Sequence, residues 1–189
     1  MSAAVELFYD YASPWSYLAD ATYARKLPGV LVELRPVFVR GFESFASGLP
    51  YGAAKMQYLA RDFVRCTEHE GVPFAPPSTF PINGLYALRG ALVAEREGRF
   101  SDYHAAMFHA AWRDARDVSQ KESVAEIARA IGIPAVADGL DDPWAKSELR
   151  ARTDAAAALG VFGVPTFAVG GELFWGHDRM DYVARAAAR

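Results

Sequence analysis

The stretch FYDYASPWSYLA, residues 8–19, marks a junction between a strand and a helix. Residues 5–9 are mostly apolar, which is typical of a short buried strand, and the apolar residues that follow recur at helical spacing. Ser13 and Pro14 stand at the junction, where serine is a preferred helix N-cap and proline suits the first turn. We therefore expect a strand over residues 5–9 and a helix from Ser13 to about Lys26.

A second strand follows this helix. The sequence VLVELRPV, residues 30–37, alternates and is rich in β-forming residues, so two strands joined by a helix predict a βαβ unit with parallel strands. Helical patterns then dominate from about residue 41 to about residue 158. The predicted helices span Lys55–His69, Leu85–Arg96, Phe100–Trp112, Glu122–Ile131 and Trp144–Leu159. The proline-rich stretch Gly71–Pro81 is expected to be an extended loop.

The last forty residues return to strands. A glycine pair, Gly170-Gly171, separates the predicted strands Thr166–Val169 and Glu172–Trp175, which indicates a β-hairpin. A final helix follows, and Asp178 is a candidate for its cap. The order βαβ, helical block, ββα predicts an α/β thioredoxin-like fold with a large all-helical insertion. Residues 1–40 and 159–189 would form the thioredoxin-like domain, and residues 41–158 the insertion.

Composition narrows the functional class. The 189 residues carry a net charge of -3 and no long basic run, which argues against nucleic acid as a partner. No apolar run reaches the roughly 20 residues of a membrane span, and the N-terminus does not resemble a signal peptide. We therefore expect a cytoplasmic protein with no membrane partner. The single cysteine, Cys66, cannot form an intramolecular disulfide and is expected to be a small buried helix residue.

The N-terminus of the first helix is the predicted site. Free N–H groups and the helix dipole favour an anion there, including a thiolate. Redox thioredoxin-like proteins carry Cys-x-x-Cys at this turn, whereas this chain carries Ser13-Pro14-Trp15-Ser16, so dithiol exchange is excluded at this position. The turn suits the thiolate of another molecule, to which the Ser13 hydroxyl can donate a hydrogen bond. A plain helix cap is the alternative interpretation of Ser13.

The sequence GVFGVPTF, residues 160–167, supplies a second part of the site. A Val164-Pro165 step before a strand is where a thioredoxin-like fold carries a cis-proline, and X-Pro bonds alone populate cis appreciably. We expect this turn to leave the backbone N–H and C=O of Val164 free for an extended peptide. A small thiol peptide would dock there and reach its sulfur to Ser13, and glutathione fits that description. The histidines show no metal-ligand pattern, so no metal site is predicted.

The three stretches FYDYASPWSYLA, GVFGVPTF and ELFWGHDRMDYV together resemble the 2-hydroxychromene-2-carboxylate isomerases. These enzymes are close relatives of kappa-class glutathione transferases within the DsbA-like group of thioredoxin folds. The resemblance runs over nearly the whole chain. It implies a cytoplasmic homodimer of aromatic catabolism, of the naphthalene-degrading type, that uses glutathione. The implied substrate is a small bicyclic hemiketal carboxylate in equilibrium with an open-chain unsaturated aromatic keto acid.

The resemblance also implies roles for individual residues. Ser13 matches the serine that activates the glutathione sulfur, and Val164 and Pro165 match the step that binds the cysteinyl backbone. His177 and Asp178 match the pair that holds the γ-glutamyl group. In chemical terms, a carboxylate such as Asp178 can accept the glutamyl ammonium.

Lys55 matches a lysine that points at glutathione in relatives, but its surroundings depart from the family. Relatives carry an asparagine about nine residues before that lysine, and the corresponding loop here, GFESFASGLPYGAAK, has none. His177 stands where glutamine or serine is usual. Arg40 and Arg89 are candidates for the substrate carboxylate, because arginine suits planar bidentate contacts.

Two other functions remain open. A kappa-like glutathione transferase or peroxidase would share the glutathione site and would consume glutathione. A non-catalytic thioredoxin-fold binding module would need no glutathione, with SPWS only as a helix cap.

Overall fold

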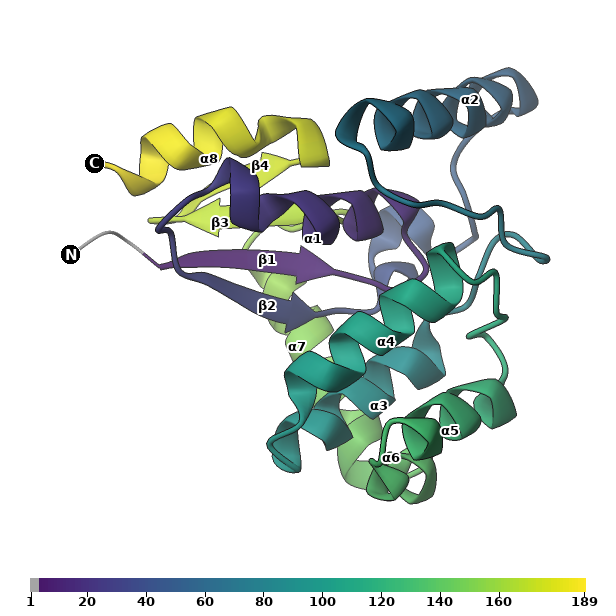
Figure 1. The fold of residues 1–189 in the computed structure, drawn as a ribbon. Coiled ribbons are helices and arrows are strands. Elements are labelled where there is room, and N and C mark those ends of the chain that lie inside the picture. The colour runs from purple at the N-terminus through teal and green to yellow at the C-terminus, as the bar shows by residue number, and fades with distance from the viewer. Residues whose placement is uncertain (1–3) are drawn as a thin grey trace.

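The computed structural model describes residues 4–189 (Figure 1). Its strands and longer helices, in chain order, are β1 (Val5–Tyr9), α1 (Pro14–Lys26), β2 (Val32–Pro36), α2 (Ala53–Glu70), α3 (Leu85–Arg96), α4 (Phe100–Trp112), α5 (Lys121–Ala130), α6 (Pro134–Gly139), α7 (Pro143–Ala158), β3 (Thr166–Val169), β4 (Glu172–Trp175) and α8 (Met180–Ala187). Short 3-10 helices span η1 (Val39–Gly41), η2 (Glu43–Phe45) and η3 (His177–Arg179). The predicted helices and strands are thus present, and the proline-rich stretch contains no helix.

The two ends of the chain meet in one sheet with the strand order β2-β1-β3-β4. Strand β1 is parallel to β2, whereas β3 is antiparallel to both β1 and β4. Leu7 in the central strand β1 lies opposite Leu34 of β2 and Phe167 of β3. This topology confirms the predicted βαβ and ββα units and the thioredoxin-like arrangement.

Both faces of the sheet are covered because the apolar residues of β1 and β3 alternate between them. On one face Leu7 and Phe167 pack in a cluster with α1 and α8, which contributes Val183. On the other face Phe8 and Ala168 pack in a cluster with residues of α7 and the loops beside it. The ends of β1 and β3 near the turn into α1 are therefore packed by an apolar cluster on each face of the sheet.

The helical block of α3 to α6 lies beside the sheet and reaches the junction between β1 and α1 (Figure 1). Trp112, at the end of α4, is buried and its Nε1 donates a hydrogen bond to the carbonyl of Tyr11, 2.8 Å away. Gly90 of α3 permits a close approach, because a Cβ there would lie 2.1 Å from the hydroxyl of Tyr103. That hydroxyl donates to the carbonyl of Ala87 at 2.9 Å. The block thus supports the turn that precedes Ser13.

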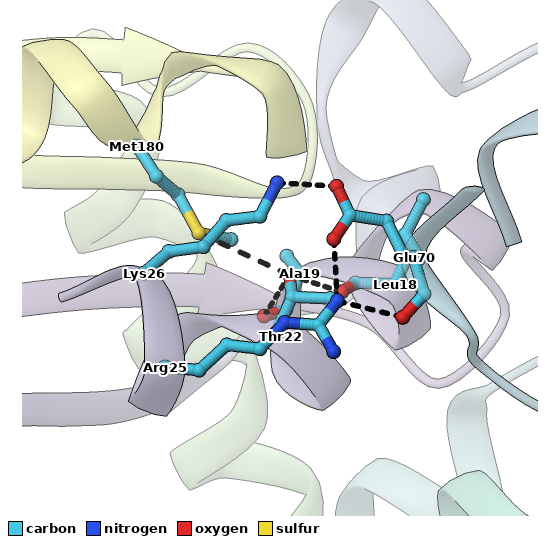
Figure 2. A network of polar contacts seen from close by, with 7 residues as sticks. All are labelled: Leu18, Ala19, Thr22, Arg25, Lys26, Glu70 and Met180. Atoms are coloured by element: carbon cyan, nitrogen blue, oxygen red, sulfur yellow. Dashed lines mark hydrogen bonds and ion pairs between the residues drawn. The ribbon is translucent and has the colours of Figure 1, made fainter.

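Helices α1 and α2 are tied together at their C-terminal ends. Arg25 and Lys26 both pair with the carboxylate of Glu70, as Figure 2 shows. Arg25 also donates to the Glu70 carbonyl at 2.8 Å. The hydrogen bond from Lys26 is the main reason that the pKa of Glu70 lies below its usual range. One turn earlier, the hydroxyl of Thr22 donates to the carbonyl of Leu18 at 2.7 Å.

Two expectations need correction, and one helix was not predicted. Asp178 does not cap the last helix, because the chain enters α8 through the 3-10 turn η3, and the N-cap residue Arg179 makes no side-chain cap. Cys66 is half-buried rather than buried. The six-residue helix α6 was not predicted.

None of the helices within residues 4–189 is both long and apolar enough to cross a lipid bilayer. The same residues contain no cluster of three or more histidine, cysteine or acidic side chains suited to a metal ion.

Candidate functional site

Ser13 is the N-cap of α1, as predicted. Its backbone is extended, and its Oγ accepts a hydrogen bond from the N–H of Ser16 at 3.2 Å. Pro14 occupies the first helical turn, where its missing N–H leaves no bond unmade. Ser13 as a residue is half-buried.

The predicted second half of the site lies next to Ser13. The Val164-Pro165 peptide bond is cis, as expected. The Ser13 hydroxyl is placed to donate to the carbonyl of Val164, at a distance of 3.5 Å. The carbonyl of Pro165 accepts a hydrogen bond from the N–H of Gly176 at 2.9 Å, which ties this step to the turn that leads into η3.

A buried carboxylate that sequence reasoning missed supports the Ser13 turn. Asp10 is fully buried, and its two oxygens accept hydrogen bonds from the N–H groups of Ala12 and Val39, each at 2.9 Å. Its carbonyl accepts from the N–H of Ser13 at 3.0 Å. Burial raises the pKa of Asp10 from 3.8 to about 6, although the two N–H groups and the nearby charge of Arg40 oppose the rise. An acidic residue directly after a buried strand was the available signal.

His177 and Trp15 form one side of the site. The imidazole stacks on the indole with ring centroids 4.9 Å apart and an angle of 16° between the planes. Phe63 of α2 contacts the same indole edge-on, at 5.2 Å. Burial lowers the pKa of His177, with smaller opposing effects from neighbouring acids such as Asp178. His177 is therefore a packed, half-buried side chain in this chain, and its neutral form is favoured.

A cavity of about 370 Å³ opens beside His177. Its lining includes Lys26, Cys66, Glu70, His177, Asp178 and Met180. Three of these, Lys26, Glu70 and Met180, are drawn in Figure 2, and the lining holds charges of both signs. Asp178 is exposed and pairs with Arg179 at 3.0 Å. Burial raises the pKa of the Cys66 thiol, which disfavours its thiolate. The lining includes neither Ser13 nor Val164, so the cavity does not itself contain the Ser13–Val164 contact.

Lys55 stands apart from this cavity. It is exposed in the first turn of α2, and its Nζ lies 4.1 Å from the centre of the Tyr51 ring. Tyr51 contacts Phe45 edge-on at 6.4 Å, and the Phe45 ring lies 3.4 Å from where a Cβ of Gly163 would stand. Lys55 is thus connected through two aromatic rings to the residue before Val164.

The two arginine candidates differ. Arg89 lies in α3 of the helical block, 3.8 Å from the carboxylate of Asp141. Arg40 lies in η1, directly after the Val39 N–H that binds Asp10. Arg40 is therefore the candidate that the structure places near the Ser13 turn.

A buried polar chain beneath α1 was also not predicted. The hydroxyl of Tyr9 lies 3.4 Å from that of Tyr11, which lies 3.0 Å from Nδ1 of His104. Nε2 of His104 lies 2.9 Å from Asp20. Burial raises the pKa of both tyrosines, so they stay protonated and serve as hydrogen-bonding core residues. His104 is thereby explained as a buried, paired core residue.

These contacts suit the binding of a small thiol. The positive end of the α1 dipole favours an anion, and the Ser13 hydroxyl can donate to a sulfur. Pro14 has no N–H, and the N–H groups of Ser16 and Tyr17 already donate to Ser13. The adjacent backbone of Val164 offers polar groups to an extended ligand, and among residues 4–189 no backbone carbonyl accepts its N–H. The charged cavity beyond His177 provides both cations and carboxylates for a ligand with ammonium and carboxylate groups. Residues 13 and 16 supply no thiol of their own.

Comparison with known proteins finds a matching domain family and similar sequences. The DSBA-like thioredoxin domain matches residues 4–188 of the chain. A 2-hydroxychromene-2-carboxylate isomerase from Sphingobium xenophagum is 26% identical over 197 residues, which cover 97% of each protein. Glutathione S-transferase kappa 1 from Homo sapiens is 29% identical over 200 residues, covering 95% of this chain and 88% of that protein.

The fold has a close counterpart among solved structures. A selenomethionine 2-hydroxychromene-2-carboxylate isomerase superimposes with a TM-score of 0.84 at 24% identity. The alignment covers 98% of this chain and 95% of that one. The helical insertion and the sheet are therefore shared as a whole.

Proposed function

Because the chain belongs to the DSBA-like thioredoxin domain family, we propose that it is a glutathione-dependent isomerase of 2-hydroxychromene-2-carboxylate-like intermediates of aromatic catabolism. The family relationship to isomerases and glutathione transferases supports an enzyme. The observation that carries the proposal is the Ser13 hydroxyl at the helix N-terminus, 3.5 Å from the Val164 carbonyl. This is a hydroxyl, where a dithiol enzyme would need sulfur.

Some of the proposed site residues would bind the glutathione sulfur, and others would bind its peptide backbone. Ser13 would turn its hydroxyl proton from the Val164 carbonyl to the glutathione thiolate. The positive end of the α1 dipole would lower the pKa of that thiol. The backbone of Val164 and Pro165 would align the cysteinyl unit. When bound, glutathione would supply a thiolate that adds reversibly to a conjugated double bond, which can then rotate as a single bond.

The remaining proposed contacts hold the ends of the glutathione molecule. Asp178 and His177 line the cavity that would receive the γ-glutamyl group, and the exposed Asp178 carboxylate can accept its ammonium. Lys55, on the exposed first turn of α2, would offer a cation to a glutathione carboxylate.

The first experiment is a calorimetric titration of glutathione into the wild-type protein, Ser13→Ala and a control variant. The control is Ser101→Ala, which changes an exposed serine in α4. Thiolate absorbance would be followed against pH in parallel. We expect the wild type and Ser101→Ala to bind glutathione and depress its thiol pKa. Ser13→Ala should bind with the depression lost. Absence of wild-type binding at millimolar glutathione would refute the proposal and favour a binding module.

A kappa-like transferase is the second candidate, favoured by the 29% identity to the human kappa enzyme. The glutathione balance discriminates the two activities. With an unsaturated aromatic keto acid, an isomerase leaves the amount of glutathione unchanged while the substrate spectrum changes. A transferase consumes one glutathione for each product formed.

A further inference from the structure

Arg40 is a half-buried arginine whose side chain has no ionic partner among the described residues. Within residues 4–189 its guanidinium has neither an ion pair nor a hydrogen bond, although the residue is half-buried. The other half-buried lysines and arginines of this range each lie in an ion pair: Lys26, Arg35, Arg89, Arg116, Lys121 and Arg152. A half-buried charge without a partner loses part of its hydration without compensation. Arg40 therefore has the property expected of a residue whose partner is a ligand.

The backbone of Arg40 is fixed to the Ser13 turn. The N–H of the preceding residue, Val39, donates to one oxygen of Asp10, and the N–H of Ala12 donates to the other. The carbonyl of Asp10 accepts from the N–H of Ser13. Both Asp10 oxygens thus accept hydrogen bonds from backbone N–H groups. The positive charge of Arg40 is near enough to lower the pKa of Asp10, but the two side chains do not form an ion pair. The donors of the guanidinium remain available.

The same loop also lies against the other half of the site. Val39 and Phe42 pack in one apolar cluster with Val164. The Phe45 ring lies 3.4 Å from the Cβ position of Gly163, the residue before Val164. The loop that carries Arg40 is therefore held beside both partners of the Ser13–Val164 contact, by contacts independent of Asp10.

We propose that Arg40 binds the carboxylate of the substrate beside the thiol site and makes the enzyme select carboxylates over neutral analogues. A guanidinium presents donors in a planar fork that matches a carboxylate bidentately, and partial burial strengthens the interaction. The identity of the bound carboxylate as a substrate group rests on the proposed function. Because Val39 and Ser13 both bond to Asp10, a carboxylate held by Arg40 would lie near the turn that holds the sulfur.

The test uses benzoylformate, an aromatic keto acid, and its neutral methyl ester as probes. Each is titrated into the wild type, Arg40→Lys, Arg40→Gln and the control Arg150→Gln, with and without saturating S-methylglutathione. Arg150 is exposed and, among the residues that the structure describes, pairs only with Asp154, at 3.7 Å. Its loss should therefore leave the site intact. Circular dichroism of each variant confirms that it is folded.

We expect the wild type and Arg150→Gln to prefer the acid over the ester by about tenfold or more. Arg40→Gln should lose this preference, and Arg40→Lys should keep part of it, with glutathione affinity unchanged in both. A preference retained in Arg40→Gln overturns the inference. Loss of glutathione affinity in place of the acid preference also overturns it, because the guanidinium would then bind a carboxylate of glutathione. Failure of the wild type to bind glutathione refutes the proposed function. The role of Arg40 is still tested in that case, because the preference for the acid over the ester is also measured without S-methylglutathione.

Discussion

The hydroxyl oxygen of Ser13 lies 3.5 Å from the carbonyl oxygen of Val164, and 151 positions of sequence separate the two residues. The sheet brings them together, because Ser13 follows β1, Val164 precedes β3, and these strands pair directly with Phe8 opposite Thr166. The distance between the two site segments is therefore set by the most buried part of the fold. Substitutions in the Ser13 turn should therefore change the chemistry of the site without moving the paired strands β1 and β3.

The two serines of the SPWS turn should differ in their effect on stability. Ser13→Ala removes the acceptor of the Ser16 N–H and should lower the free energy of unfolding by about 1 kcal/mol. The Ser16 hydroxyl is buried and has no partner within residues 4–189, so Ser16→Ala should leave stability unchanged or raise it. Urea denaturation of both variants measures the difference. Equal losses would contradict this assignment of the hydrogen bonds.

Asp10 should reduce stability as pH rises. Its pKa is raised in the folded state to about 6 from 3.8, so the folded protein binds the proton more tightly than the unfolded chain. Its contribution is fully present below about pH 4 and is lost as pH rises through about 6. Chemical denaturation of the wild type and Asp10→Asn between these values should show a pH slope in the wild type that the variant lacks. Identical slopes would contradict the raised pKa.

His177 should titrate below the ordinary range of histidine. Burial against Trp15 lowers its pKa, so the folded state favours the neutral ring. Its stabilising contribution is present above about pH 6.5, the pKa of an unfolded histidine, and is lost as pH falls through the lower folded value. NMR titration of the imidazole protons tests this, with His177→Gln used to assign the resonance. A pKa at or above the ordinary value would show that the stack is open in solution.

Gly90→Ala should reverse the usual sign of a helical glycine substitution. In a helix interior, alanine is ordinarily more stable than glycine by roughly 0.5–1 kcal/mol. Here the new Cβ would lie 2.1 Å from the Tyr103 hydroxyl, so the variant should be less stable than the wild type by thermal or urea unfolding. Adding Tyr103→Phe removes the hydroxyl and should reduce the loss. A gain in stability from Gly90→Ala alone would contradict the close contact.

Much of the fold was predictable because its signals are local. The helices Leu85–Arg96 and Phe100–Trp112 and the hairpin strands have the predicted bounds, since a clear apolar period and the Gly170-Gly171 turn mark them. Helix α6 was missed because six residues hold too little of a helical period to be recognised. Asp178 was expected to cap α8, but the chain reaches that helix through a 3-10 turn, and its carboxylate pairs with Arg179.

The site was predictable at its two backbone features and less so in its side chains. Ser13 as N-cap and the cis bond before Pro165 follow from short motifs. The stack of His177 on Trp15 and the packing of Phe45 beside Gly163 arise from residues far apart in sequence, so no local pattern indicates them. Asp10 was overlooked because its role depends on Val39, across the sheet in the loop after β2.

The attachment of α2 has a mechanical consequence. One end of this helix is fastened to α1 by two cations on a single carboxylate, Glu70, whereas near the other end Lys55 rests on a single aromatic ring. The C-terminal end of α2 is therefore held to α1 by charge, and its middle is held by the packing of Phe63 against Trp15. Added salt should weaken the pairing of the exposed Arg25 with Glu70 before it weakens the apolar packing of Phe63, since screening acts on charges and not on apolar contacts.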